Sequence, residues 1–364
     1  MKKTLLTLCM ILGLASCGDK AQEQKANEKP IIKIGAILPL TGGAAQLGEG
    51  AKNGAIMALE QLNKNSDNHY KYELIIEDIG LSPSKTLPVY SKMIQLDKVA
   101  GLVSFNTAAG KIIKPLASKD KVLHLSSAAD NTISDKTFNY VNSYSLKETS
   151  NRLVEYMKAN QMKTISLVVF NHLSTEPIVQ ALEPVLRDND IEILSIDRFN
   201  TEQRDFKMEA LKIKELNPDM VFVHLVEPVL TLFPKQLLQD GYKGKLSSFL
   251  MFAYSANPIL FEGQPFVDLR EGSDDFNQEY KQRFGVDAQA ASINTYDNVM
   301  LIAEFIEKNG SPKDVATDKI YEAMQNVVSN YKSPRGELML DDGLVYSNTT
   351  IKTIKDGRSV AVEE

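Results

Sequence analysis

The sequence has few of the residues that build metal, disulfide or covalent catalytic sites. Of its 364 residues only two are cysteines, Cys9 and Cys17. Everything after Cys17 can therefore form no disulfide, no cysteine nucleophile and no cysteine metal site. Only four histidines occur, without a regular ligand spacing, so we expect no bound metal and no cofactor. Tryptophan is absent, which argues against sugar binding by indole stacking.

Long apolar runs and a strong positive charge are also missing. After the N-terminal segment no stretch holds eighteen consecutive apolar residues, so no further membrane span is expected. The formal net charge is -6, which argues against a nucleic acid partner and against a polybasic membrane patch. Serine hydrolase, zinc protease, P-loop and EF-hand strings do not occur. We therefore expect a protein that is not an enzyme.

The N-terminus has the pattern of an export signal. Two lysines precede an apolar stretch over residues 5–14, which is too short to span a bilayer. The string Leu-Ala-Ser-Cys that ends at Cys17 resembles a bacterial lipoprotein signal, and an ordinary signal peptide is the alternative. The resemblance implies that residues 1–16 are removed and that Cys17 carries acyl chains, which would hold the protein on a membrane. The polar residues that follow predict a flexible tether over residues 17–30.

The rest of the chain alternates short apolar runs with amphipathic stretches. Before residue 142 the apolar runs predict strands over residues 31–38, 72–76, 99–105 and 122–125. A second series of strands is predicted over residues 164–170, 191–196, 220–224 and 246–251. Stretches with helical periodicity separate the strands, which indicates βαβ units and parallel sheets. The end of the chain, from Gly336, again has a β-like pattern.

Several motifs resemble one family in order and spacing. The opening Ile32-Lys33-Ile34-Gly35-Ala36-Ile37-Leu38-Pro39-Leu40-Thr41-Gly42 resembles the start of the leucine/isoleucine/valine-binding family of type I periplasmic binding proteins. Residues 48–60 are similar to the family's first helix, and residues 101–103 are similar to the strand before its first ligand loop. Residues 126–129 lie where the family has a second ligand loop, and residues 294–297 resemble a late helix. Order and length agree from residue 31 to about 355.

The resemblance implies the fold and its division. We expect an α/β protein with two Rossmann-like lobes, each with a parallel sheet, joined by three crossovers. Lobe 1 is expected to hold residues 31–146 plus 272–337. Lobe 2 is expected to hold residues 147–271 plus 338–364. A ligand would lie in the cleft between the lobes, which would close over it by a hinge motion.

Candidate ligand contacts follow from the carboxyl ends of the predicted strands, where open α/β sheets bind ligands. That rule and the resemblance select nearly the same loops. The candidate residues are Asn106, Thr107, Ser127, Ala128, Asp130, Ser174, Glu227 and Tyr254.

The resemblance assigns some of these candidates a role and leaves others open. Thr107 matches a hydroxyl and Ala128 a backbone contact to a ligand carboxylate, although Thr107 would equally serve as a helix cap. Asp130 would pair with a ligand ammonium or hold a turn. Tyr254 would form an aromatic wall or pack in the core. The family's ammonium-binding acid falls near Tyr254, where no acid stands, so Asp130 or Glu227 would replace it, or the ligand has no ammonium.

Two functions fit this pattern. The first is a lipid-anchored extracytoplasmic solute-binding protein that captures an amino acid or a related amide or carboxylate for an ABC importer. Its partners would be the small ligand, the ABC permease and the membrane, and we expect a monomer on the periplasmic face of the cell envelope. The alternative is an envelope receptor or an assembly or regulatory lipoprotein that binds a protein partner with the same fold.

Overall fold

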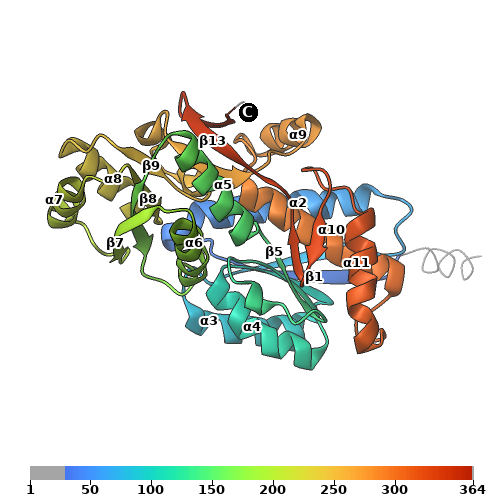
Figure 1. The fold of residues 1–364 in the computed structure, drawn as a ribbon. Coiled ribbons are helices and arrows are strands. Elements are labelled where there is room, and N and C mark those ends of the chain that lie inside the picture. Colours follow the sequence, from blue (N-terminus) through green and yellow to red (C-terminus); the bar gives the residue numbers. More distant parts are fainter. Residues whose placement is uncertain (1–28, 363–364) are drawn as a thin grey trace, which may run out of the picture.

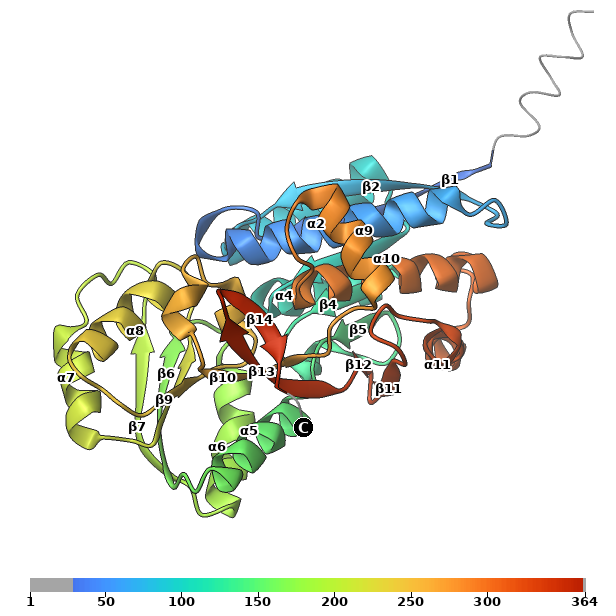
Figure 2. The same ribbon diagram turned by 90° about the horizontal axis from the view of Figure 1, so that it is seen from above.

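The computed structural model describes residues 29–362. The predicted signal, Cys17 and all but the last two tether residues lie outside this range, so the lipidation of Cys17 stays a prediction. Two α/β lobes lie side by side and are joined by three passages of the chain (Figures 1 and 2), which confirms the predicted fold class. Within residues 29–362 no helix combines the length and apolar character needed to cross a membrane.

Lobe 1 is built on a seven-stranded sheet. Its strands in spatial order are β11 (Met339–Asp341), β12 (Leu344–Tyr346), β5 (Asn139–Asn142), β4 (Leu123–Ser127), β3 (Gly101–Phe105), β1 (Ile31–Leu38) and β2 (Lys71–Asp78). β12 pairs in parallel with β5, and β11 pairs with β12 in the antiparallel sense. The sequence analysis placed residues 338–364 in lobe 2, so this pairing moves β11 and β12 to lobe 1. Apolar periodicity identifies such short strands but does not show which sheet they extend.

Helices cover both faces of the lobe 1 sheet because successive strand side chains point to opposite faces. In β1, Ile34 and Ala36 pack with one helical layer, and Ile37 packs with the other. The first layer holds α2 (Ala45–Lys64), α10 (Ala290–Asn309) and α11 (Ile320–Asn330). The second layer holds α3 (Pro83–Lys92) and α4 (Thr107–Asp120). α9 (Asp274–Phe284) packs on α2 and α10 through Phe276 and Tyr280. Short helical turns are η1 (Gly42–Ala44), η2 (Met93–Asp97), η3 (Asn131–Ile133) and η6 (Thr317–Lys319).

Lobe 2 repeats this plan on a smaller scale. Its parallel sheet has the order β7 (Glu192–Phe199), β6 (Thr164–Phe170), β8 (Met220–His224) and β9 (Lys245–Ser247). In β8, Val221 and Val223 pack toward α7 (Lys207–Leu216) and α8 (Val229–Gln239). Phe222 packs toward α5 (Leu146–Ala159) and α6 (Glu176–Asp188) on the other face.

An antiparallel three-stranded sheet completes lobe 2. It contains β10 (Pro265–Leu269), β13 (Thr349–Lys355) and β14 (Arg358–Ala361). The Val267 N–H donates to the carbonyl oxygen of Ser248 at 3.0 Å, which joins this sheet to the end of β9. The predicted strand over residues 246–251 therefore ends early, and η4 (Met251–Tyr254) and η5 (Pro258–Phe261) follow it. The chain passes between the lobes at residues 143–145, 270–273 and 347–348.

Candidate functional site

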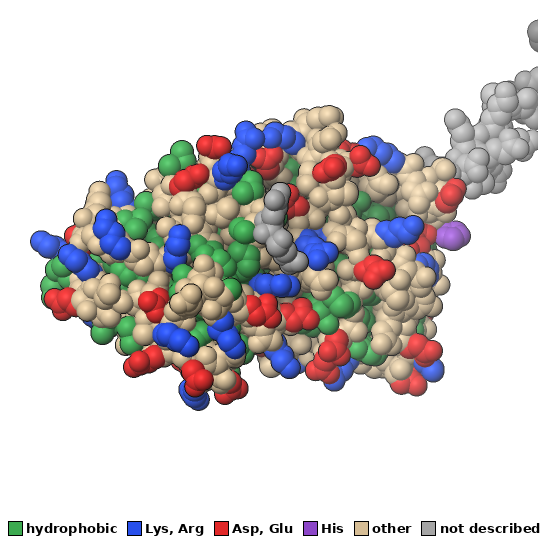
Figure 3. Space-filling model, turned by 45° about the horizontal axis from the view of Figure 1, so that its top comes forward, with side chains coloured by type: hydrophobic (Ala, Val, Ile, Leu, Met, Phe, Trp, Pro, Cys, Tyr) green, Lys and Arg blue, Asp and Glu red, His purple; other side chains and the backbone are tan. Residues whose placement is uncertain are grey.

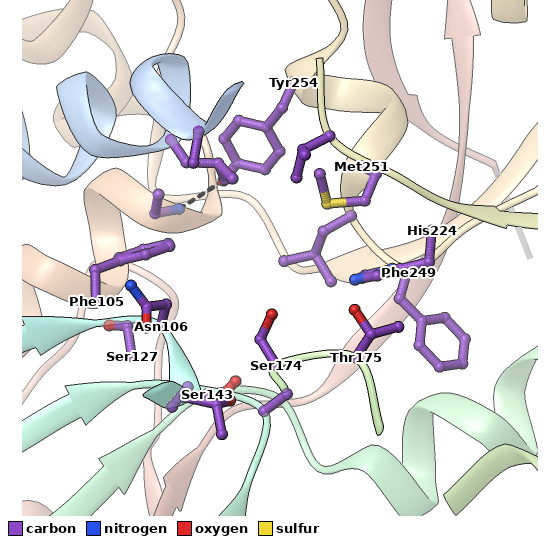
Figure 4. A pocket seen from close by; sticks show the side chains of 18 of the residues that line it. Phe105, Asn106, Ser127, Ser143, Ser174, Thr175, His224, Phe249, Met251 and Tyr254 are labelled. Atoms are coloured by element: carbon purple, nitrogen blue, oxygen red, sulfur yellow. Dashed lines mark hydrogen bonds between the residues drawn. The ribbon is translucent and has the colours of Figure 1, made fainter. Parts of the chain in front are cut away.

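A cavity of about 140 Å³ lies between the two lobes (Figure 4). An engineered apolar cavity of about 150 Å³ holds a benzene molecule, so the space suits a ligand of about one ring. Its lining comes from the loops at the carboxyl ends of strands of both lobes and from the start of α10. The lining residues are Pro39, Ala44, Leu47, Leu81, Phe105, Asn106, Thr107, Ser127, Ala128, Ala129, Ser143, Tyr144, Phe170, Ser174, Thr175, Ile178, His224, Val226, Phe249, Leu250, Met251, Tyr254, Ala290, Ala291 and Asn294.

The cleft has an uncharged wall. Among the described residues that line it there is no Asp, Glu, Lys or Arg. Burial lowers the pKa of His224 to about 4, so its imidazole is neutral at pH 7, and a ring nitrogen points into the cavity (Figure 4). Burial raises the pKa values of Tyr144 and Tyr254. Within residues 29–362 no three His, Cys, Asp or Glu side chains gather as a metal site.

The N-terminus of α4 opens onto this cleft. The side-chain oxygen of Asn106 accepts the Ala109 N–H at 2.9 Å, which makes Asn106 the cap of the helix. Thr107 is the first helical residue and is fully buried. Its Oγ1 has no hydrogen-bond partner within residues 29–362. The capping role proposed for Thr107 therefore falls to Asn106, and the Thr107 hydroxyl is left beside the cavity.

The cleft brings together six of the eight candidate residues. They are Asn106, Thr107, Ser127, Ala128, Ser174 and Tyr254. The other two, Asp130 and Glu227, are not among the lining residues, and each has partners elsewhere.

Asp130 holds a turn. Its carboxylate accepts the N–H of Thr132 at 2.9 Å and pairs with the Lys111 ammonium at 2.5 Å. Burial alone would raise the pKa of Asp130, but the bonds from Lys111 and Thr132 outweigh it and keep the pKa below its usual range. The turn alternative for Asp130 is thus the one that the contacts favour. A pairing with a ligand ammonium has no support in this geometry.

Glu227 ties together two loops of lobe 2. Its carboxylate accepts the Thr231 hydroxyl at 2.8 Å, the Ala256 N–H at 2.9 Å and the Ser255 hydroxyl at 3.3 Å. These bonds join the start of α8 to the segment after η4. All three bonds go to Oε1, and Glu227 is not among the residues that line the cleft, so these contacts give no support for Glu227 as the missing acid.

The two lobes touch directly across the cleft. The Tyr254 hydroxyl of lobe 2 accepts the Ala291 N–H of α10 at 2.7 Å, and Gln289 donates to the Ala253 carbonyl oxygen at 2.5 Å. Tyr254 is therefore both buried and part of the cleft wall. A Cβ atom on Gly43 would come within 3.0 Å of a backbone oxygen of lobe 2. These contacts describe a closed arrangement of the lobes.

Several lining residues were not among the sequence candidates. Ser143 and Tyr144 follow β5, a strand that the apolar pattern did not reveal, so the strand-end rule would have found them once β5 was known. Phe249 lies after the shortened β9, and Asn294 lies in the first turns of α10. The sequence analysis matched residues 294–297 to a helix of the family and gave Asn294 no ligand role, because only the packing of α10 brings this residue to the cleft.

Comparisons with known proteins agree with this architecture. The sequence pattern of a family described as "Periplasmic binding protein" matches residues 31–358. A curated relative from Pseudomonas aeruginosa, the "leucine-, isoleucine-, valine-, threonine-, and alanine-binding protein", is 23% identical over 85% of this chain and 86% of its own.

Two solved structures show the same fold. A branched-chain amino acid transporter substrate-binding protein from Streptococcus pneumoniae, in complex with isoleucine, gives a TM-score of 0.80 at 16% identity over 91% of this chain and 98% of its own. An ABC transporter solute-binding protein from Rhodopseudomonas palustris, in complex with 3,4-dihydroxy benzoic acid, gives a TM-score of 0.76 at 20% identity. The match covers 91% of this chain and 96% of that protein's chain. The chain therefore belongs to the periplasmic binding protein family, among the type I members that resemble the leucine/isoleucine/valine-binding proteins.

Proposed function

We propose that this protein captures a small solute between its lobes and delivers it to an ABC importer. The observation that carries the proposal is the cleft itself: both lobes line it, and Tyr254 and Gln289 bridge the lobes beside it. A site divided between two lobes exists only when they close, so ligand binding and closure are coupled. The closed form would then be the one that an importer recognises.

The ligand contacts proposed from the sequence are narrowed by this geometry. We place Asn106, Thr107, Ser127 and Ala128 of lobe 1 at the ligand. Ser174 and Tyr254 of lobe 2 complete the set, and Asp130 and Glu227 leave it. The ligand class stays within the predicted range of amino acids and related amides or carboxylates. Isoleucine and 3,4-dihydroxy benzoic acid, which similar proteins hold in their solved structures, are both carboxylic acids.

We propose that the protein is exported as a monomer and held on the membrane by acyl chains on Cys17. The periplasmic binding protein family implies a place outside the cytoplasm, and the string that ends at Cys17 supports the anchor. Radiolabelled palmitate should be incorporated into the wild-type protein and should not be incorporated into Cys17→Ser.

On the face drawn in Figure 3, acidic and basic side chains are intermixed, unlike the one-sign surface that nucleic acid binding requires.

The experiment that tests the function is a ligand screen by thermal unfolding of the purified chain carrying Cys17→Ser. The panel holds branched and aromatic amino acids, their des-amino acids, amides, dicarboxylates, aromatic acids, urea and polyamines. A ligand at 100 times its Kd adds about 2.7 kcal/mol to the free energy of unfolding. That gain raises Tm by several degrees. A folded, ligand-free protein that shifts with no compound would instead favour the receptor for a protein partner.

A further inference from the structure

Three polar side chains of lobe 1 line the cleft with their oxygen already accepting a hydrogen bond within the protein: Asn106, Ser127 and Asn294. The Asn106 side-chain oxygen accepts the Ala109 N–H as a helix cap. Its amide nitrogen is therefore the group that is left for a ligand. An amide nitrogen can only donate hydrogen bonds.

The side-chain oxygen of Asn294 is also occupied, in this case by a buried arginine. Arg335 Nη1 donates to Asn294 Oδ1, and Arg335 Nη2 donates to the Ala290 carbonyl oxygen at 2.9 Å. Because a guanidinium has no acceptor, this contact decides which end of the amide is the oxygen. Because Arg335 occupies Oδ1 and the buried Asn294 lines the cleft, the Nδ2 is the end of this amide that is left for a ligand.

Ser127 is the third side chain whose oxygen already accepts a hydrogen bond. Its hydroxyl oxygen accepts from Asn298 Nδ2 at 3.1 Å, and Asn298 Oδ1 in turn accepts from Asn142 Nδ2 at 2.8 Å. The chain of amides thus supplies a donor to Ser127 and leaves its proton free for the cleft. Beside it stands the unpaired, fully buried Oγ1 of Thr107, at the N-terminus of the 14-residue helix α4. That helix end carries a partial positive charge.

Lobe 1 therefore presents several hydrogen-bond donors and no cation. Such a wall fits the acceptor-only oxygens of a carboxylate. An ammonium group has the opposite needs, because it brings three donors and a charge that must be paired when it leaves water. No carboxylate stands among the described residues that line the cleft. The two acids considered as partners of a ligand ammonium have partners elsewhere: Asp130 pairs with Lys111, and Glu227 accepts from Thr231.

The remaining wall is apolar and limits the size of the ligand body. Phe170, Ile178, Phe249 and Met251 of lobe 2 face the donors across a space of about 140 Å³. Ser174, Thr175 and His224 add neutral polar groups, and Figure 4 shows the two hydroxyls turned toward the cavity. This half of the cleft suits one ring or a branched chain that carries, at most, an uncharged polar substituent.

We infer that the cleft selects a monocarboxylate without an ammonium group and with a body of about one six-membered ring, and that Arg335 positions Asn294 to read the carboxylate. This inference rests on the proposed function, since it names the solute class of the same cleft. It separates the protein from relatives that bind α-amino acids.

The test compares acids that differ only in the amino group. Two pairs meet this condition: 4-methylpentanoate against leucine and 3-phenylpropanoate against phenylalanine. Benzoate against benzylamine, which carries an ammonium in place of the carboxylate, is a separate comparison, and all compounds are titrated into the full-length protein by calorimetry. We expect each acid to bind at least tenfold more tightly than its amino partner. Equal or tighter binding of leucine or phenylalanine overturns the inference and leaves the proposed function intact. Failure of every compound in the wider panel overturns the proposed function itself.

Two variants test the residues that carry the inference. Asn294→Asp keeps a partner for Arg335 but replaces the donor by a carboxylate, so acid binding should fall at least tenfold, while the exposed Asn151→Asp on α5 should bind as wild type. Arg335→Met frees the Asn294 amide to turn its oxygen to the cleft, which should narrow the preference for acid over amino acid. Arg335→Gln still donates and should keep the preference. An unchanged preference in folded Asn294→Asp and Arg335→Met overturns the assignment.

Discussion

Gly43 of lobe 1 lies against the backbone of lobe 2, which gives a sharp prediction about closure. Gly43 lies in η1 of lobe 1, and an added Cβ would meet the backbone oxygen of Glu227 in lobe 2 within 3.0 Å. Real Cβ atoms do not approach an oxygen so closely, and the backbone on both sides cannot turn away as a side chain could. Gly43→Ala should therefore oppose the closed state and leave the separate lobes unaffected.

The size of the effect follows from the cost of overpacking, which is about 1–3 kcal/mol for one extra carbon in a close-packed region. If only the closed state binds ligand fully, this cost appears as a loss of affinity of roughly 5- to 150-fold. The free energy of unfolding without ligand should change little, because the open protein does not make the contact.

The assay is calorimetric titration with the tightest acid of the panel, together with thermal unfolding of the unliganded protein. Gly50→Ala is the matched control: the nearest neighbour of its added carbon would be the Ser292 hydroxyl oxygen at 3.3 Å, within lobe 1. We expect Gly50→Ala to bind normally. Wild-type affinity in Gly43→Ala, with wild-type stability, would refute the view that this contact belongs to the ligand-bound form.

Three further predictions concern buried polar groups. Burial holds the pKa of His124 at about 4, so between pH 6.5 and pH 4 the unfolded chain binds a proton that the folded chain does not bind. The free energy of unfolding should therefore fall by up to about 3 kcal/mol as the pH drops. Urea titrations at pH 7.5 and pH 4.5 should show a smaller fall in His124→Gln than in the wild type. Lys352→Met leaves the carboxylate of Asp268 buried without its cation, since both side chains are over 90% buried. The free energy of unfolding, measured with urea, should fall by about 3–5 kcal/mol. Lys319→Met, which removes an ion pair on the surface, should lower it by less than about 1 kcal/mol. Tyr254→Phe removes one of the acceptors that lobe 2 offers to lobe 1, so ligand affinity measured by calorimetry should fall about two- to tenfold with little change in unliganded stability.

Much of the fold was predictable because its signals are local. The apolar run over residues 31–38 is buried on both faces in β1, as parallel strands are, and the amphipathic period before residue 64 becomes α2. The errors came where tertiary pairing decides. β5 has only four residues and carries Asn139 and Asn142, so its sequence does not look apolar. Likewise, β12 belongs to lobe 1 because it pairs with the edge of β5, and no local sequence pattern reveals that pairing.

The site was predictable to the extent that it follows strand ends. The strand-end rule and the family resemblance together selected Asn106, Thr107 and Ser127, all of which line the cleft. The same rule also selected Asp130, because it cannot tell a side chain that faces the cleft from one that folds back on its own turn. The orientation of Asn294 by Arg335 joins residues 41 positions apart and could only be seen in three dimensions.

Capture of a small solute requires the two lobes to close around it, and the chain offers a direct way to measure this closure. No cysteine follows Cys17, so spin labels can be placed at exposed positions through Lys85→Cys on α3 and Met208→Cys on α7. Distances between the labels, measured by pulsed electron double resonance, should become shorter and more uniform when the tightest acid is added. The pair Met208→Cys and Lys243→Cys within lobe 2 should not change. A distance across the lobes that stays the same while calorimetry shows the cleft saturated would contradict the claim that the solute is captured by closure.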